Sequence, residues 1–170
     1  TTQAVRRAVT LSAGVYWGVL AALLLLGLAL RAWQLGAPDL WTDEVLSALR
    51  ARAPLQEALD SILSVGNQAP LYYLGMRLVP HDTALQLRLP AAILGLVNIV
   101  QLAVLVERVY ADRLLALQAA ALLTVSPLHV ILSRTARFYT LLMLFALVAL
   151  YCFALLVRGR RTRAVWAGLI

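Results

Sequence analysis

The chain has 170 residues and a formal net charge of +7, with 62% hydrophobic and 14% charged residues. Soluble domains carry roughly 25% charged and about 45–50% apolar residues, so this composition excludes a water-soluble globular domain, a disordered chain and a disulfide scaffold. The fifteen basic residues are all arginine and lie scattered between apolar stretches, which disfavours a nucleic-acid partner. We therefore predict an all-α protein that crosses a membrane several times.

Four uncharged stretches predict membrane-spanning helices, because a hydrocarbon core of about 30 Å needs about 20 helical residues. They cover residues 8–30, 89–106, 114–133 and 138–157. The first is longer than the apolar core of a signal peptide, so we expect a retained anchor. A further apolar run begins at residue 164 and the chain lacks an initiator Met, so we expect one transmembrane domain over residues 1–170 that is the N-terminal fragment of a longer protein.

The segment of mixed character between the first two spans, residues 32–87, carries six of the eight acidic residues. It contains an apolar set with the i, i+4, i+7, i+8 spacing of a helix that lies on a membrane surface, namely Leu55, Leu59, Ile62 and Leu63. Residues 70–79 are apolar over a length of only about 15 Å of helix. We expect them to form a partly inserted helix that does not cross the membrane.

Orientation follows from the arginines that flank the spans, because positive residues favour the cytoplasmic side. They occur before the first span, between the second and third, and after the last: Arg6, Arg7, Arg108, Arg113, Arg158, Arg160, Arg161 and Arg163. With all three groups in the cytoplasm, the N-terminus is cytoplasmic and four spans close consistently. Residues 32–87 and 126–137 are then outside.

The first candidate catalytic sequence is Trp41-Thr42-Asp43-Glu44, in the predicted external segment. Thr42 is predicted to cap a helix, and two acids in the first turn of that helix complement its dipole. An external carboxylate could also take a proton from a hydroxyl acceptor. The two interpretations are compatible, because a capped helix start holds a carboxylate in a fixed place.

Arginines at the predicted outer ends of spans are candidates for binding an anion. Arg134 and Arg137 are three residues apart, so on a helix they share a face, and Tyr139 follows them. A helix start with two guanidinium groups favours an anion site, although snorkelling arginines beside an interfacial tyrosine fit the same pattern. Arg88 precedes Pro90, which we place in the first turn of the second span; it is either a third anion-binding arginine or an anchor.

Polar residues within the spans predict contacts between helices. Asn98, Gln101 and Gln118 are expected to form hydrogen bonds with neighbouring helices, and His129 is expected to be a satisfied or an interfacial side chain and not a ligand. The sequence contains no Cys/His spacing typical of a metal site, so we predict no metal site and no cofactor. Whether a divalent metal takes part remains open at this point.

The order of these features resembles that of the C-type (GT-C) membrane glycosyltransferases. The resemblance is carried by Trp41 to Glu44, Ala69-Pro70-Leu71-Tyr72-Tyr73, Arg88-Leu89-Pro90 and Ser133 to Tyr139, in this order along the chain. Within that class the chain is most similar to the bacterial branch that is related to protein O-mannosyltransferases and to the lipid A aminoarabinose transferase.

The resemblance implies a multi-pass glycosyltransferase of the bacterial inner membrane, with a polyprenyl-phosphate sugar as donor at the outer face. It implies a catalytic carboxylate at Asp43 with Glu44 beside it, and phosphate-handling arginines at Arg88 and Arg137. We expect Arg134 and Tyr139 to bind the donor phosphate together with these arginines. The acceptor hydroxyl, on a glycan, lipid or protein, is not identified. Phosphate monoesters have a second pKa of about 6, so the leaving group needs charge neutralisation more than a strong acid. A single displacement would invert the anomeric centre.

The alternative is a non-catalytic membrane protein, such as a transporter fragment or a structural subunit of a lipid-processing complex. A transporter should carry ionisable groups near the middle of the bilayer. The four predicted spans contain no Asp, Glu or Arg. This favours an interfacial site, and with it the enzyme.

Overall fold

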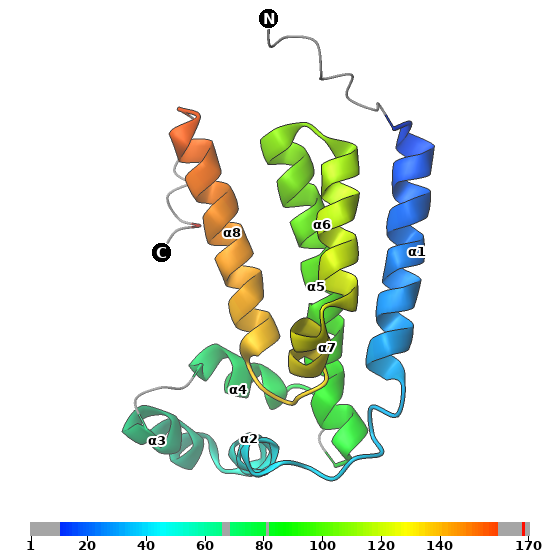
Figure 1. Ribbon diagram of the computed structural model, residues 1–170. Helices are drawn as coiled ribbons and strands as arrows, with labels where there is room; N and C mark the ends of the chain where they lie inside the picture. The colour runs from blue at the N-terminus through cyan, green and yellow to red at the C-terminus, as the bar shows by residue number, and fades with distance from the viewer. Residues whose placement is uncertain (1–10, 66–68, 81, 160–167, 169–170) are drawn as a thin grey trace, which may run out of the picture.

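The computed structural model describes residues 11–65, 69–80, 82–159 and 168, and this part of the chain is all-helical (Figure 1). Its helices are α1 (Ala13–Ala32), α2 (Thr42–Arg52), α3 (Leu55–Val65), α4 (Pro70–Met76), α5 (Ala84–Tyr110), α6 (Arg113–Val125), α7 (Pro127–Ser133) and α8 (Tyr139–Val157). The predicted all-α class is confirmed. Arg6, Arg7, Arg160, Arg161, Arg163 and residues 164–167 and 169–170 lie outside the described residues.

The long helices α1, α5, α6 and α8 form a bundle in which α5 contacts the other three. Within the described residues, α1, α5 and α8 are each long and apolar enough to cross a membrane, and the bent pair α6–α7 makes a fourth candidate. The chain is therefore a multi-pass membrane protein, as predicted. The start of α1, the α5–α6 turn and the end of α8 lie at one end of the bundle, as four consecutive crossings require (Figure 1).

The second span is longer than predicted, because α5 begins at Ala84 and not at residue 89. Thr83 caps it: its Oγ1 accepts from the Gln86 N–H at 3.3 Å, and the Gln86 side chain accepts from the Thr83 N–H at 3.1 Å. Pro90 consequently lies inside the helix, so its placement in the first turn is wrong. The difference arises because the charged residue Arg88 lies within the helix and not at its start.

The third predicted span, residues 114–133, is not one straight helix. α6 and α7 are bent by 62° at Ser126, immediately before Pro127. Proline has no N–H for the helix ladder and its ring clashes with the preceding turn. The side chain of Ser126 accepts from the His129 N–H at 3.4 Å and so caps the new helix.

Helices α2, α3 and α4 lie across the other end of the bundle, and we call them the platform (Figure 1). As predicted, α4 is too short to cross a membrane. The platform packs on the bundle through a cluster of buried residues that comprises Ala48, Ala51, Ile62, Tyr72, Tyr73, Met76, Leu87 and Ala136. This packing brings α2 and α4 against the start of α5 and against the segment that joins α7 to α8.

Two amides in α5 connect it to α8. Asn98 Nδ2 donates to the Thr140 carbonyl and Gln101 Nε2 donates to the Leu144 carbonyl, each at 3.0 Å. These contacts confirm the predicted hydrogen bonds between helices, which supply specificity where lipid and side chains are equally apolar. Gln118, in contrast, is exposed on α6.

Candidate functional site

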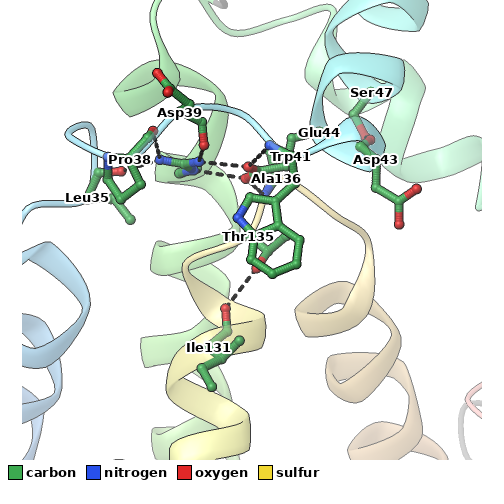
Figure 2. Close-up of polar contacts among 11 residues, drawn as sticks. Leu35, Pro38, Asp39, Trp41, Asp43, Glu44, Ser47, Ile131, Thr135 and Ala136 are labelled. Atoms are coloured by element: carbon green, nitrogen blue, oxygen red, sulfur yellow. Dashed lines mark hydrogen bonds and ion pairs between the residues drawn. The ribbon is translucent and has the colours of Figure 1, made fainter.

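The first turn of α2 places the two candidate acids. The N-cap residue is Trp41, so the predicted cap at Thr42 is wrong by one residue. Glu44, the third helical residue, accepts the Trp41 N–H on its carboxylate at 3.2 Å. This bond turns the Glu44 side chain back over the helix start, whereas the carboxylate of its neighbour Asp43 points away from it (Figure 2).

Glu44 forms a buried ion pair with Arg88 of α5. Arg88 Nε donates to Glu44 Oε1 at 2.8 Å and Arg88 Nη2 donates to Oε2 at 2.7 Å, and the two side chains are only 1% and 4% exposed. The planar fork of arginine matches both carboxylate oxygens. The pair therefore connects the platform to a membrane-spanning helix.

The remaining donors of Arg88 are used by the connection between α1 and α2. Nη1 donates to the Leu35 and Pro38 carbonyls at 2.9 and 3.0 Å, and Nη2 donates to the Asp39 carbonyl at 3.0 Å (Figure 2). With the two bonds to Glu44, all five N–H groups of the guanidinium are donated within the described chain. Arg88 has no donor left for a phosphate in this conformation.

Glu44 also holds the segment between α7 and α8. Its Oε1 accepts the Ala136 N–H at 2.8 Å (Figure 2). Burial by itself would raise the pKa of Glu44, but the hydrogen bonds from Arg88, Ala136 and Trp41 outweigh burial and lower the pKa below its ordinary value. Glu44 is thus a fixed anion that three segments of the chain share.

Asp43 forms a different pair, with Arg137. Asp43 Oδ2 lies 3.8 Å from Arg137 Nη2, and the Asp43 side chain is 60% exposed whereas that of Arg137 is 11% exposed. This distance is at the limit of an ion pair and longer than a hydrogen bond. The carboxylate of Asp43 is accordingly open to solvent and to a substrate, while an arginine lies beside it.

Arg137 has aromatic neighbours and an unused donor. Its guanidinium carbon lies 5.3 Å from the centre of the Phe138 ring and 5.9 Å from that of Tyr139, and Nη1 donates to the Tyr73 hydroxyl at 3.4 Å. Nε is buried and has no hydrogen-bond partner among the described residues. Two rings therefore hold the cation in place without using up its donors.

Arg134 and Arg137 do not share a helical face, and that prediction is wrong. Residues 134–138 form the non-helical connection between α7 and α8. The connection bends because Ala136 turns its N–H to Glu44 instead of continuing a helix. Arg134 Nη2 donates to the Trp33 carbonyl at 2.6 Å, so Arg134 ties this connection to the end of α1.

Sequence reasoning assigned no role to Tyr72 and Tyr73, although both stand in a motif that carried the resemblance. Tyr72 is buried in the platform, and its hydroxyl has no hydrogen-bond partner in the part of the chain that the structure describes. Burial raises the pKa of Tyr72, and Tyr73 and Glu44 raise it further, so its hydroxyl stays protonated. Arg50 lies over the Tyr73 ring, 5.1 Å from its centre.

An apolar cavity of about 550 Å³ opens beside Tyr72, between the platform and the bundle. Its lining comes from α4, the segment after α4, α5 and α8, and comprises Leu71, Tyr72, Gly75, Met76, Val79, Pro80, Gln86, Leu89, Pro90, Ile93, Leu94 and Leu141. Almost all of these side chains are hydrocarbon. The cavity therefore suits a lipid chain better than a sugar or a peptide.

Two arginines lie just beyond the predicted ends of the spans, yet within the helices. Arg31 lies in the last turn of α1 and Arg88 in the second turn of α5, because both helices continue past the boundaries that the charges suggested. Both arginines are near the platform end of their helices. They are therefore close to the proposed interface and not midway along a span.

The fold and site together define a polytopic helical membrane protein with a carboxylate–arginine site at one end of its bundle. A family model described as dolichyl-phosphate-mannose-protein mannosyltransferase matches residues 70–170, which is more than half of the chain. The chain belongs to this family of membrane glycosyltransferases, which confirms the resemblance. The match includes Tyr72, Arg88 and Arg137, whereas Asp43 precedes it. No curated protein and no solved structure matches the chain.

Proposed function

We propose that this chain carries the reaction centre of a glycosyltransferase that moves a sugar from a polyprenyl-phosphate donor to a hydroxyl acceptor. The observation that carries the proposal is the open pair of Asp43 and Arg137, in which an exposed carboxylate lies 3.8 Å from an arginine with an unused donor. A base for the acceptor and a cation for the leaving group thus stand side by side.

In this proposal Asp43 is the general base. The acceptor oxygen attacks the anomeric carbon, the bond from that carbon to the phosphate oxygen breaks, and the proton of the hydroxyl goes to the Asp43 carboxylate. Polyprenyl phosphate leaves with the electron pair of the broken bond. One displacement inverts the anomeric centre. The exposure of Asp43 supports this role, because an acceptor can reach it.

Arg137 neutralises the phosphate as it leaves. Its buried Nε and the Tyr72 hydroxyl both lack partners among the described residues, and buried polar groups are rarely left unpaired. A phosphate oxygen would accept from both. Tyr139 is a positioning residue here, because its ring lies beside the Arg137 guanidinium.

The apolar cavity beside Tyr72 is proposed to hold the first isoprene units of the donor. It shares Tyr72 with the proposed phosphate site, so a lipid chain in the cavity would present its phosphate near Arg137. Membrane lipid could enter along the same surface. The acceptor, whether a glycan, a lipid or a protein, would approach from the exposed side of Asp43, and no cofactor or metal is required by this chemistry.

The other candidate site residues receive structural roles in this proposal. Glu44 and Arg88 position the start of α2, because their donors and acceptors are used within the protein. Arg134 holds the connection between α7 and α8 on α1. The groups proposed to contact the substrates are then Asp43, which takes the proton, and Arg137 and Tyr72, which bind the phosphate.

The activity test uses the full-length protein in vesicles with a synthetic polyprenyl-phosphate mannose and an acceptor extract from the membrane of the source cell. We expect labelled sugar to move to the acceptor and the product to have the inverted anomeric configuration by NMR. A product of retained configuration would refute the single displacement. A binding protein without activity would leave the donor intact at every acceptor concentration.

The platform is proposed to face the outside of a bacterial inner membrane, with the N-terminus in the cytoplasm. In a Cys152→Ser background, single cysteines at Ser64 in α3 and at Tyr110 at the end of α5 report the two sides, since both positions are exposed. A membrane-impermeant maleimide should label Ser64→Cys in intact spheroplasts and Tyr110→Cys only after lysis. Labelling of both in intact spheroplasts would refute this topology.

A further inference from the structure

Arg31 is a fully buried cation that the proposed reaction does not use. Its Nη2 lies 2.7 Å from His129 Nδ1, and its Nη1 donates to the Gly27 carbonyl at 3.0 Å and to the Thr124 carbonyl at 3.4 Å. Arginine can only donate hydrogen bonds, so His129 Nδ1 is the acceptor and carries no proton. A buried guanidinium is costly unless acceptors of this kind surround it, and these partners leave only Arg31 Nε without one among the described residues.

The partners of Arg31 lie on both sides of the bend between α6 and α7. Thr124 is in the last turn of α6, and His129 is in the first turn of α7. Carbonyl groups in the last turn of a helix lack partners, and Pro127 supplies no N–H for them. Arg31 donates to one such carbonyl and to a side chain beyond the bend, so it connects α1 to both halves of the broken span.

Two glycines make room for this arrangement. A Cβ atom on Gly95 of α5 would lie 2.5 Å from Ser133 Cβ and 3.2 Å from Arg31 Nε, and one on Gly27 would lie 3.3 Å from Arg31 Nη1. Separations under 3 Å between carbon atoms force a shift of the backbone. The close approach of α7 to α5 thus depends on the absence of a side chain at Gly95.

The end of α7 leads directly into the site. Ser133 is fully buried at the last position of α7, and its hydroxyl donates to the His129 carbonyl at 2.7 Å. Three residues later the Ala136 N–H reaches Glu44, and the next residue is Arg137. A rotation or shift of α7 would therefore move Arg137 relative to Asp43.

We propose that Arg31 is a positioning residue: through His129 it holds α7 at its bend and so places the segment 134–137, with Arg137, beside Asp43. This inference rests on the proposed roles of Arg137 and Asp43. An arginine that only anchors a helix extends its charged group to the membrane interface. The guanidinium of Arg31 is instead fully buried, and the proposed role accounts for that burial.

Hydrogen–deuterium exchange of the full-length protein in nanodiscs tests the inference without reference to transfer. Arg31→Gln and His129→Leu should accelerate exchange in peptides that cover 134–138 by tenfold or more. His129→Asn should preserve protection, since its amide oxygen can replace Nδ1 as the acceptor. Leu128→Ala, at an exposed position on the same helix, is the matched control and should leave exchange unchanged.

The same variants have a kinetic readout. Arg31→Gln and His129→Leu should lower kcat by tenfold or more, and His129→Asn should recover at least half of that loss on a logarithmic scale. Should Arg31→Gln fail to fold, the two His129 variants decide, because leucine preserves the volume of the site. Wild-type exchange at 134–138 in His129→Leu would overturn the inference, as would equal exchange in His129→Leu and His129→Asn. An inactive wild-type protein would refute the proposed function alone.

Discussion

Asp43 and Glu44 are adjacent in the chain, yet the two ion pairs that they form differ in burial, in distance and in how many of their donors and acceptors are used. The Glu44–Arg88 pair is 1% and 4% exposed and bidentate, at 2.7 and 2.8 Å, and every donor and acceptor in it is used. The Asp43–Arg137 pair is open on the carboxylate side, at 3.8 Å, and the arginine retains an unused donor. Of these two pairs, only the second has an exposed carboxylate and a donor without a partner among the described residues.

This comparison separates a structural pair from the pair that we propose to react. A fully satisfied buried pair is costly to break and gains little from a new ligand. A loose pair at a surface contributes roughly 0–1 kcal/mol to stability. Its two groups can therefore bind a substrate with little loss in the free energy of unfolding. The tight pair holds the start of α2 and the segment before α8, and thereby brings the loose pair together.

The largest expected effect is on transfer by Asp43→Asn. The amide keeps the shape of the side chain but cannot take the proton of the acceptor, so we expect a loss of about 10²–10⁴-fold in kcat, the range for a general base. Transfer from polyprenyl-phosphate sugar by the full-length protein measures it. The melting temperature should stay unchanged, because the carboxylate is exposed.

Asp60→Asn is the matched control for Asp43→Asn, since it removes an exposed platform carboxylate that makes no contact with Arg137. It should retain full activity. Wild-type kcat in Asp43→Asn would remove Asp43 from the reaction and would make both pairs structural.

Glu44→Gln should show the reverse profile, with stability as the main loss. The amide nitrogen cannot accept from Arg88, so the guanidinium is left buried without its counterion. Removing one partner of a buried pair costs about 3–5 kcal/mol. Unfolding of the protein in detergent by denaturant measures this. Asp39→Asn is the control, because Arg88 contacts Asp39 only through its backbone carbonyl; equal stability of the two variants would contradict the comparison.

Arg137 should show a graded effect. A charged hydrogen bond is worth about 1.5–3 kcal/mol, or roughly 10- to 150-fold in an equilibrium constant. Arg137→Ala should lose this factor in kcat/KM for the donor, and Arg137→Lys should recover only part of it, because lysine keeps the charge without the planar fork. Donor titration at saturating acceptor measures both variants. An Arg137→Lys protein equal to wild type would indicate an interfacial anchor.

The smallest effect concerns acid stability and Glu44. Because its pKa in the folded protein is lowered, Glu44 contributes stability that is fully present above the unfolded value of about 4.3 and is lost as the pH falls through the folded value. The free energy of unfolding of the wild type should therefore decline below about pH 4.3. Glu44→Gln should lack that part of the decline, and a parallel decline in both proteins would contradict the assignment.

The sequence by itself determined the class and the approximate positions of the apolar helices, and it supplied the candidate site residues. Long uncharged stretches can only be satisfied as helices in lipid, because every backbone polar group must find a partner within its own segment. The end of α8 and the short α4 were predicted, and so was the fact that Asn98 and Gln101 bond to a neighbouring helix, although not that this helix is α8. The short motifs located Asp43 and Arg137, although not their contact.

Only the tertiary structure decided which carboxylate pairs with which arginine. Glu44 and Arg88 are 44 positions apart and Asp43 and Arg137 are 94 apart, so no local spacing relates them. A charge is costly in lipid, so the sequence predicts that the first span ends before Arg31. In the structure Arg31 lies in the last turn of α1, where it contacts His129 and occupies space that Gly95 leaves open. Partners of this kind depend on how separate helices pack, and the pattern of a single segment contains no information about its neighbours.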